Sequence, residues 1–200
     1  MLQIRIHGRG GQGVVTAAEL LSVAAFEQGR HAQAFPSFGS ERTGAPVVAF
    51  CRIDEHEIRL REPILAPDVL IVQDPTLLHQ VDVFQGLRPD GYVLINSKRS
   101  FDALGLADLT ARFRHERLIT VPATEIAQQH LGRPLPNAVL LGGFAALSGL
   151  ITLDAVAHAI REKFGGRTGS KVAEANVAAA AEAYAYVQHE MEDLAHAQAD

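Results

Sequence analysis

Three glycines near the start of the chain are spaced for anion binding. Gly8, Gly10 and Gly13 fit the pattern G-x-G-x-x-G, between an apolar alternation over residues 2–7 and a helical pattern that begins at Val14. Glycines let the backbone approach an anion closely, and the first amides of the following helix point at it with a favourable dipole. The loop is predicted to bind a pyrophosphate; the alternative is a tight turn that needs glycine only for its dihedral angles.

A nicotinamide dinucleotide fits this loop poorly. In folds that bind NAD, an acidic residue that holds the ribose stands about 20 residues beyond the glycines. Residues 28–40 contain neither Asp nor Glu, and no acid or base for hydride transfer is evident. A free-standing NAD-dependent dehydrogenase is therefore disfavoured.

A polar segment over residues 31–46 is predicted to form a long loop at the carboxyl edge of the sheet, above the glycine loop. Arg9 and Arg42 would then both reach phosphate, which the planar guanidinium binds through two parallel hydrogen bonds. A ligand with a pyrophosphate and a further phosphate, such as coenzyme A, suits this set better than NAD. The alternative is an ordinary surface loop in which Glu41 forms an ion pair. Ser37 and Ser40 are not in a G-x-S-x-G elbow, so a hydrolase triad is disfavoured.

The elements that must position these residues follow from the periodicity of apolar side chains. Strands are predicted over residues 2–7, 46–53, 68–74, 91–96 and 117–121, and a short return strand over residues 57–60. Helices are predicted over about residues 14–29, 123–130, 138–150, 153–164 and 171–194. The result is one α/β domain, residues 1–200, with a Rossmann-like open, mostly parallel sheet, helices on both faces and a helical C-terminal third.

Polar residues mark the ends of several of these elements. Asp74 and Asn96 end two buried strands at the edge where ligands bind, but capping of the local loop is the more common role of such residues, so neither is assigned to catalysis. Asn137 and Thr152 are predicted to be N-caps of two helices. Gly142 and Gly143, in an almost wholly apolar helix, are predicted to let another backbone come close.

Composition excludes several functions. A net charge of -5 gives no broad cationic surface for nucleic acid or for an anionic membrane. The single cysteine, Cys51, excludes an internal disulfide and an iron–sulfur cluster held by this chain alone, and the histidines lack metal-binding spacing. No signal peptide or membrane-spanning run is evident, which predicts a cytoplasmic protein.

Several ordered motifs resemble one known family over most of the chain. IRIHGRGGQGVVTAAELL, AQAFPSFGSERTGAPVVAFCRID, PDVLIVQDPTLL and GRPLPNAVLLGGFAALSGL are similar to the gamma subunit of the pyruvate and 2-ketoisovalerate ferredoxin oxidoreductases. Thr43 departs from the family pattern E-R-R-G-A-P at the second arginine, so a phosphate contact from that position is not carried over.

The resemblance implies a subunit of a 2-oxoacid:ferredoxin oxidoreductase that is inactive alone. Alpha, beta and delta-type partner subunits would carry thiamine diphosphate, magnesium and 4Fe–4S clusters, while this chain would help to bind coenzyme A and contribute no catalytic residue. The residues that bind coenzyme A would be Arg9, Gly10, Gly11, Gln12, Gly13, Ser37, Phe38, Gly39, Glu41 and Arg42.

Two alternatives within this resemblance stay open. One is a scaffolding or regulatory subunit without a contact to coenzyme A, and the other is the beta subunit of an indolepyruvate-type oxidoreductase. The substrate also stays open between pyruvate, 2-ketoisovalerate, 2-oxoglutarate and an aryl glyoxylate, because other chains would hold most of it.

Overall fold

A six-stranded mixed sheet forms the centre of the protein, as a computed structural model shows for residues 1–37, 43–166 and 170–197. In sheet order the strands are β2 (His31–Pro36), β3 (Pro46–Asp54), β1 (Leu2–Arg9), β4 (Val69–Val72), β5 (Tyr92–Asn96) and β6 (Leu118–Val121). Strands β1, β4, β5 and β6 are parallel, whereas β3 is antiparallel to both of its neighbours. We call the edge at which the four parallel strands end the carboxyl edge, and the opposite one the amino edge.

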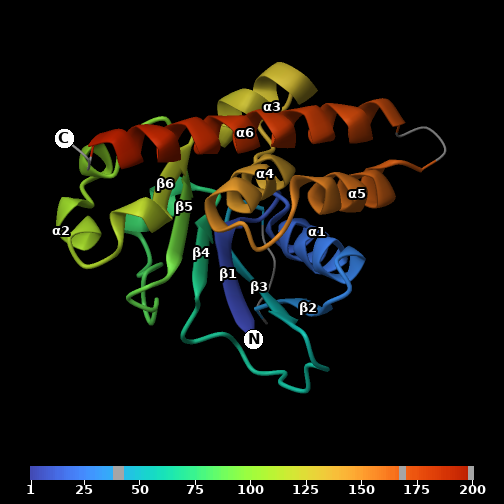
Figure 1. Cartoon of the computed structure of the whole chain (residues 1–200), viewed down its shortest axis with the longest axis horizontal. Coiled ribbons are helices and arrows are strands. Elements are labelled where there is room, and N and C mark those ends of the chain that lie inside the picture. Colours follow the sequence, from blue (N-terminus) through green and yellow to red (C-terminus); the bar gives the residue numbers. More distant parts are fainter. Residues whose placement is uncertain (38–42, 167–169, 198–200) are drawn as a thin grey trace.

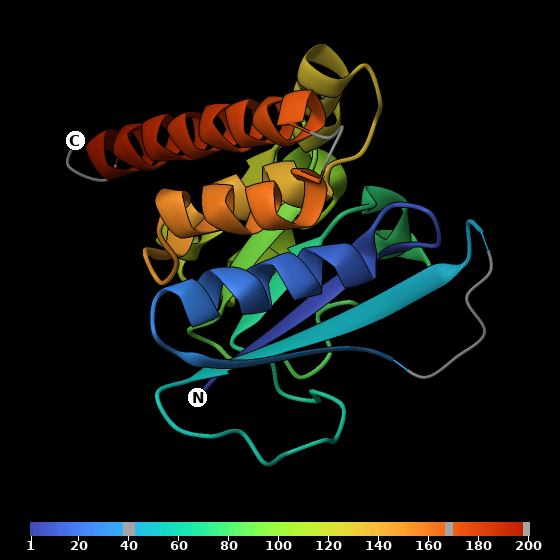
Figure 2. The same ribbon diagram turned by 90° about the vertical axis from the view of Figure 1, so that its right-hand side faces the viewer.

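One face of the sheet is covered by helices in successive layers (Figures 1 and 2). They are α1 (Val14–Glu27), α3 (Ala123–Leu131), α4 (Asn137–Ser148), α5 (Leu153–Phe164) and α6 (Ser170–Ala197). Helix α1 packs on β1, β2 and β3, α4 packs beside it on β5 and β6, and α6 lies over α4 and α5. No helix among the described residues is both long and apolar enough to cross a membrane.

Helix α4 is buried almost all round because it lies between the sheet and α6. A β-carbon at Gly142 would stand 1.9 Å from the Ala180 carbonyl oxygen, so only glycine permits this approach of two backbones. A β-carbon at Gly143 would stand 3.3 Å from a side-chain atom of Val187 in α6 and 3.6 Å from side-chain atoms of Leu94 and Val121 in the sheet. The predicted close approach of another backbone is confirmed at Gly142, whereas the nearest atoms at Gly143 belong to side chains.

The opposite face is covered by short helical turns and loops. Under β4, β5 and β6 an apolar cluster includes residues of η1 (Pro75–His79) and η2 (Asp102–Leu104). Leu106 and Phe113, on either side of α2 (Ala107–Thr110), pack against this cluster, and η3 (His115–Arg117) leads into β6. Under β1 and β3 the face is polar, because Arg5, His7 and Arg52 alternate with core residues and turn away from α1. The Arg5 guanidinium donates to the carbonyls of Val83 (2.8 Å) and Gln85 (2.6 Å).

The predicted fold class is confirmed, and three local predictions are wrong. Residues 31–36 form strand β2 rather than loop; their inward side chains, Ala32 and Ala34, are small and so give only a weak alternation. Residues 57–60 form no strand, since β2 already occupies the free edge of β3. Asn137 is the first residue of α4 rather than its N-cap, a position taken by Pro136.

Candidate functional site

The glycine loop joins β1 to α1 at the carboxyl edge and leaves the first amides of the helix open. Gly13 is the N-cap, with φ +70°, and no side chain of the described residues accepts a hydrogen bond from the first turn of α1. The first-turn amides of a helix have no acceptor within the helix and carry a partial positive charge. A β-carbon at Gly13 would stand 2.4 Å from Asn137 Nδ2, so glycine is required both for the backbone angle and for space.

Asp74, two residues after the end of β4, holds the glycine loop in place. Its carboxylate accepts from Arg9 Nε (3.1 Å), Gln12 Nε2 (2.8 Å), Thr76 Oγ1 (2.6 Å) and the Thr76 amide (3.0 Å). Burial acts to raise the pKa of Asp74, but the hydrogen bonds from Thr76 and Gln12 and the charge of Arg9 outweigh it, so the pKa lies below its ordinary value. The carboxylate is thus charged at neutral pH and anchors two residues of the loop.

Arg9 binds protein acceptors on several sides. Besides Asp74, its guanidinium donates to the Gly44 carbonyl (3.0 Å), Thr76 Oγ1 (2.7 Å) and Gln80 Oε1 (2.9 Å). Five N–H donors are all that a guanidinium has, so these contacts leave little of Arg9 for a ligand phosphate. Its side chain instead connects β1, the residues after β4 and the chain around Gly44.

Thr43, just after the segment predicted to contact the ligand, lies beside the glycine loop, whereas Ser37 continues from β2 along β3. The exposed Ser37 donates its amide to the Val48 carbonyl (2.8 Å), and Thr43 forms an isolated bridge with Gly10. The Gly10 amide donates to the Ala45 carbonyl (2.9 Å). The predicted site residues Phe38, Gly39, Glu41 and Arg42 lie outside the described residues.

Cavities open on the two sides of the glycine loop. The larger one, about 630 Å³, we call the helical cavity. It is lined by Gly11, Gly13, Thr16, His130, Leu131, Arg133, Leu135, Asn137, Phe164, Lys171, Val172, Ala175 and Asn176. The smaller one, about 270 Å³, is lined by residues of the loop and of α1, from Arg9 to Thr16, together with Val47. The first-turn amides of α1 therefore lie between two cavities.

Sequence reasoning missed the helical cavity, because its walls come from five helices far apart in the chain. The signal that could have pointed to it is two asparagines, one at the start of an almost wholly apolar segment and one just before an alanine-rich one. Asn137 is 7% exposed and Asn176 is 6% exposed. Asn176 Nδ2 donates to the Val172 carbonyl (2.8 Å), whereas the Asn137 side chain has no hydrogen-bond partner within the described part of the chain.

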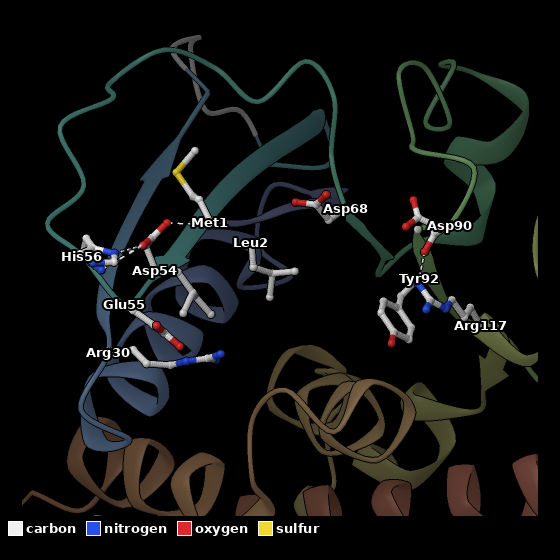
Figure 3. Close-up of a pocket in the computed structure, with 12 residues that line it drawn as sticks. Met1, Leu2, Arg30, Asp54, Glu55, His56, Asp68, Asp90, Tyr92 and Arg117 are labelled. Carbon is white, nitrogen blue, oxygen red and sulfur yellow. Dashed lines mark hydrogen bonds and ion pairs between the residues drawn. The ribbon is translucent and has the colours of Figure 1, made fainter.

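A cavity of similar size, about 560 Å³, lies at the amino edge (Figure 3). Several of its charged groups bind one another or the backbone. The amino group of Met1 lies 3.0 Å from Asp54 Oδ2, His56 Nδ1 lies 3.4 Å from Asp54 Oδ1, and Arg117 donates to the Asp90 carbonyl. The backbone hydrogen bond from His56, followed by the contacts of the amino terminus, lowers the pKa of Asp54 to about 2.

Two further titratable groups are buried under the sheet or within it. His7, 7% exposed, has an Nε2 atom without a partner among the described residues, and burial together with the charge of Arg5 lowers its pKa to about 4. Burial raises the pKa of the Cys51 thiol to about 12. Within the described ranges, no three His, Cys, Asp or Glu side chains gather as metal ligands would.

The sequence places this site in a known family. Residues 3–186 match the model of the pyruvate ferredoxin/flavodoxin oxidoreductase family. The chain belongs to this family. Within it, this oxidoreductase chain is similar to pyruvate synthase subunit PorC of Methanothermobacter marburgensis, with 48% identity over 88% of this chain and 93% of the relative. It is also similar to the common gamma subunit of the pyruvate/ketoisovalerate oxidoreductases of Pyrococcus abyssi, with 47% identity over 94% of this chain and 98% of the relative.

Solved structures agree with this assignment to the oxidoreductase family. The pyruvate oxidoreductase subunit PORC of Thermotoga maritima superposes with a TM-score of 0.75 and 34% identity, over 92% of this chain and 94% of the other. The 2-oxoglutarate:ferredoxin oxidoreductase of Magnetococcus marinus shares the fold, with a TM-score of 0.70 and 18% identity, over 94% of this chain but only 31% of that longer one. The predicted resemblance to gamma subunits is confirmed.

Proposed function

We propose that this gamma-type chain is the coenzyme A-holding subunit of a 2-oxoacid:ferredoxin oxidoreductase. The observation that carries the proposal is the uncapped first turn of α1, whose amides face two cavities at the carboxyl edge. Helix amides of this kind bind phosphate oxygens, and coenzyme A carries a diphosphate. The amides of Gly10 and Gln12 already donate to the carbonyls of Ala45 and Arg9. The primary contacts in this proposal are therefore the amides of Gly11 and Gly13 and those of the first turn of α1.

The side chains of the loop have different parts in it. Arg9 and Gln12 both bind Asp74, so they position the loop rather than bind the phosphates themselves. Thr43, the residue after Arg42, forms a bridge with Gly10 of the loop, which makes Arg42 the candidate for a direct phosphate contact. This division departs from the expectation that both arginines bind phosphate.

The rest of the reaction belongs to partner subunits in this proposal. Alpha, beta and delta-type chains hold thiamine diphosphate with magnesium and the 4Fe–4S clusters, because one buried cysteine in this chain cannot bind a cluster. By holding the distant end of coenzyme A, the gamma chain raises the effective concentration of the thiol at the acyl intermediate without touching the reacting atoms. Relatives named for pyruvate and ketoisovalerate make these two 2-oxoacids the first substrates to assay.

The test is the coenzyme A dependence of the purified complex with Arg42→Ala. The apparent KM for coenzyme A is expected to rise about tenfold, which corresponds to one lost charge-assisted contact of about 1.5 kcal/mol. A single-turnover decarboxylation without coenzyme A is expected to stay normal. Arg61→Ala, on an exposed loop away from the carboxyl edge, is the control. An unchanged KM in an intact complex contradicts the direct contact and favours a purely scaffolding subunit.

A further inference from the structure

Strand β2 forms one edge of the sheet, and the described residues leave its outer side open (Figure 1). The strand pairs with β3 and packs against α1, and the sheet formed by the described residues has no strand beyond it. None of its six residues is buried, whereas β3 contains five buried residues in succession. An open edge offers backbone donors and acceptors to a further strand.

The hydrogen-bond pattern of β3 shows which of its residues bond to each neighbour. The Gly10 amide donates to the Ala45 carbonyl (2.9 Å), so the odd-numbered residues of β3 bond to β1 and the even-numbered ones to β2. The Ser37 amide donates to the Val48 carbonyl (2.8 Å), which agrees with this alternation. On β2, the residues that bond to β3 are therefore 31, 33 and 35.

The backbone groups of the alternate residues of β2 point outward. Ala32 and Ala34 each present an amide and a carbonyl to the open side, and no hydrogen bond among the described residues uses these groups. Pro36 has no amide hydrogen, so the run of outward donors ends before it. The edge thus offers two donors and two acceptors in a row.

Strand β2 lacks the features that protect many natural edge strands. Such strands commonly carry charged side chains, lysine above all, or a bulge that interrupts pairing. The sequence HAQAFP contains no Lys, Arg, Asp or Glu, and its register with β3 is unbroken over all six residues. Its one proline stands at the last position. A second strand of the same sequence therefore meets no like charge across the seam.

Two copies of β2 fit together in one antiparallel register. A two-fold axis through Gln33 sets Ala32 opposite Ala34 of the second copy, and each such pair exchanges two backbone hydrogen bonds. All outward groups of the alanines are then satisfied. An axis through either alanine instead sets the other one opposite Arg30, whose amide is already bonded, or opposite Pro36, which has no amide hydrogen.

The side chains on the face away from α1 agree with this register. Gln33 lies beside Gln33 of the second copy, and Phe35 lies opposite its His31. Phe35 already packs against Phe50, with ring centroids 5.2 Å apart, and the Arg52 guanidinium lies over its ring. An aromatic ring beside an imidazole and two facing amides are cross-strand pairs that stabilise an antiparallel sheet.

We propose that β2 pairs with β2 of a second copy of this chain, so that the two sheets join into one continuous sheet. The contact is symmetric, since each copy contributes the same residues. Because the paired strands are antiparallel, the carboxyl edges of the two sheets point in opposite directions. Both glycine loops therefore stay open to partner subunits of the oxidoreductase.

The experiment is disulfide trapping of Gln33→Cys in the purified complex. Directly opposed residues that exchange no backbone hydrogen bonds have α-carbons about 4.5 Å apart, within reach of a disulfide. Mild oxidation is expected to give a covalent dimer of the chain on a non-reducing gel, about tenfold faster or more than in the control His31→Cys.

The control residue is on the same strand and on the same face. His31 is exposed, whereas Gln33 is half-buried, so random collisions would cross-link His31→Cys at least as fast. In the proposed register the two copies of His31 stand about 14 Å apart, too far for a disulfide. The unmodified chain is a second control, because its single thiol, Cys51, is buried.

A second variant removes an outward hydrogen bond without changing the pairing of β2 with β3. Ala34→Pro, combined with Gln33→Cys, deletes an amide hydrogen that points to the open side, and the rate of cross-linking is expected to fall about tenfold. Thermal unfolding checks that this variant is folded. If it is not, Gln33→Glu replaces it, because two carboxylates then face each other across the seam. Sedimentation is expected to show a dimer for the unmodified purified chain and a monomer for Gln33→Glu.

Cross-linking of Gln33→Cys that is no faster than that of His31→Cys overturns the proposal. Reaction of the Gln33→Cys thiol with a maleimide then shows what occupies the edge. Protection in the intact complex means that a segment of another subunit lies there in place of the second copy, and full modification means that the edge stays open. The measurement reports strand pairing rather than coenzyme A dependence, so its outcome is independent of the proposed function.

Discussion

The carboxyl and amino edges of the sheet carry cavities of similar size, about 630 Å³ and 560 Å³, yet they differ in how their polar groups are satisfied. At the amino edge the Met1 amino group binds Asp54, and the Asp68 carboxylate binds Arg88 (3.2 Å). At the carboxyl edge, the first-turn amides of α1 have no side-chain cap and Asn137 has no partner among the described residues. Volume therefore does not distinguish the two cavities, whereas the first-turn amides of α1 do.

The largest expected difference between the edges is in stability. Asp74→Ala removes the acceptor of Arg9, Gln12 and Thr76 at once, so the free energy of unfolding of the purified subunit is expected to fall by about 3 kcal/mol. Asp54→Ala at the amino edge is expected to change it far less, since the chain terminus and the exposed His56 return to water at little cost. Urea unfolding measures the free energy of unfolding of both variants. Equal losses of stability in Asp74→Ala and Asp54→Ala would contradict the role of Asp74 as the anchor of the glycine loop.

The next effect is a dependence of stability on pH that arises close to the carboxyl edge. The unfolded chain binds a proton on His7 below about pH 6.5, whereas the folded chain binds it only below about pH 4. Between these values the unfolded state binds more protons, so stability falls as the pH is lowered, by about 2 kcal/mol at pH 5 relative to pH 7.5.

His7→Gln is expected to remove this part of the pH dependence. The measurement is the urea midpoint at pH 7.5 and at pH 5, with His56→Gln on the exposed amino-edge loop as the control. If the unmodified subunit and His7→Gln lose the same stability on acidification, His7 is not the group responsible.

The smallest expected effect is a difference in stability between alanine substitutions at the two glycines that flank α1. Gly13 at the carboxyl edge and Gly29 beyond the other end of the helix both have positive φ, but a β-carbon meets Asn137 only at Gly13. Gly29→Ala is expected to cost about 1 kcal/mol of stability, and Gly13→Ala about 1 kcal/mol more. Only Gly13→Ala is expected to raise the KM for coenzyme A. Equal behaviour in both assays would argue that Asn137 and Gly13 do not form one site.

The sequence predicted the parts of the fold whose signal is local. The glycine loop, the continuous apolar strands β4 and β5, and the helix α5 with its Thr152 cap (Ala155 amide to Thr152 Oγ1, 3.2 Å) all lie where periodicity and capping placed them. Strand β2 was missed because edge pairing, rather than hydrophobic pattern, stabilises it.

The site was predictable only in part, because its contacts join distant segments. The glycine pattern identified the loop, but nothing near Arg9 in the sequence indicates that Asp74, Thr76 and Gln80 fold against its guanidinium. The helical cavity depends on α3, α4 and α6 meeting at the start of α1. Residue types signalled an anion site, and tertiary packing determined which side chains remain available to a ligand.

The contact between Gly142 and Ala180 has a consequence for how the protein is made. Helix α4 is apolar on nearly every side, and the surface that covers its outer side belongs to α6, the last helix of the chain. During synthesis α4 leaves the ribosome before its partner exists, and an uncovered apolar helix favours association with other nascent chains. A ribosomal pause between α5 and α6 would therefore prolong the exposure of the apolar surface of α4.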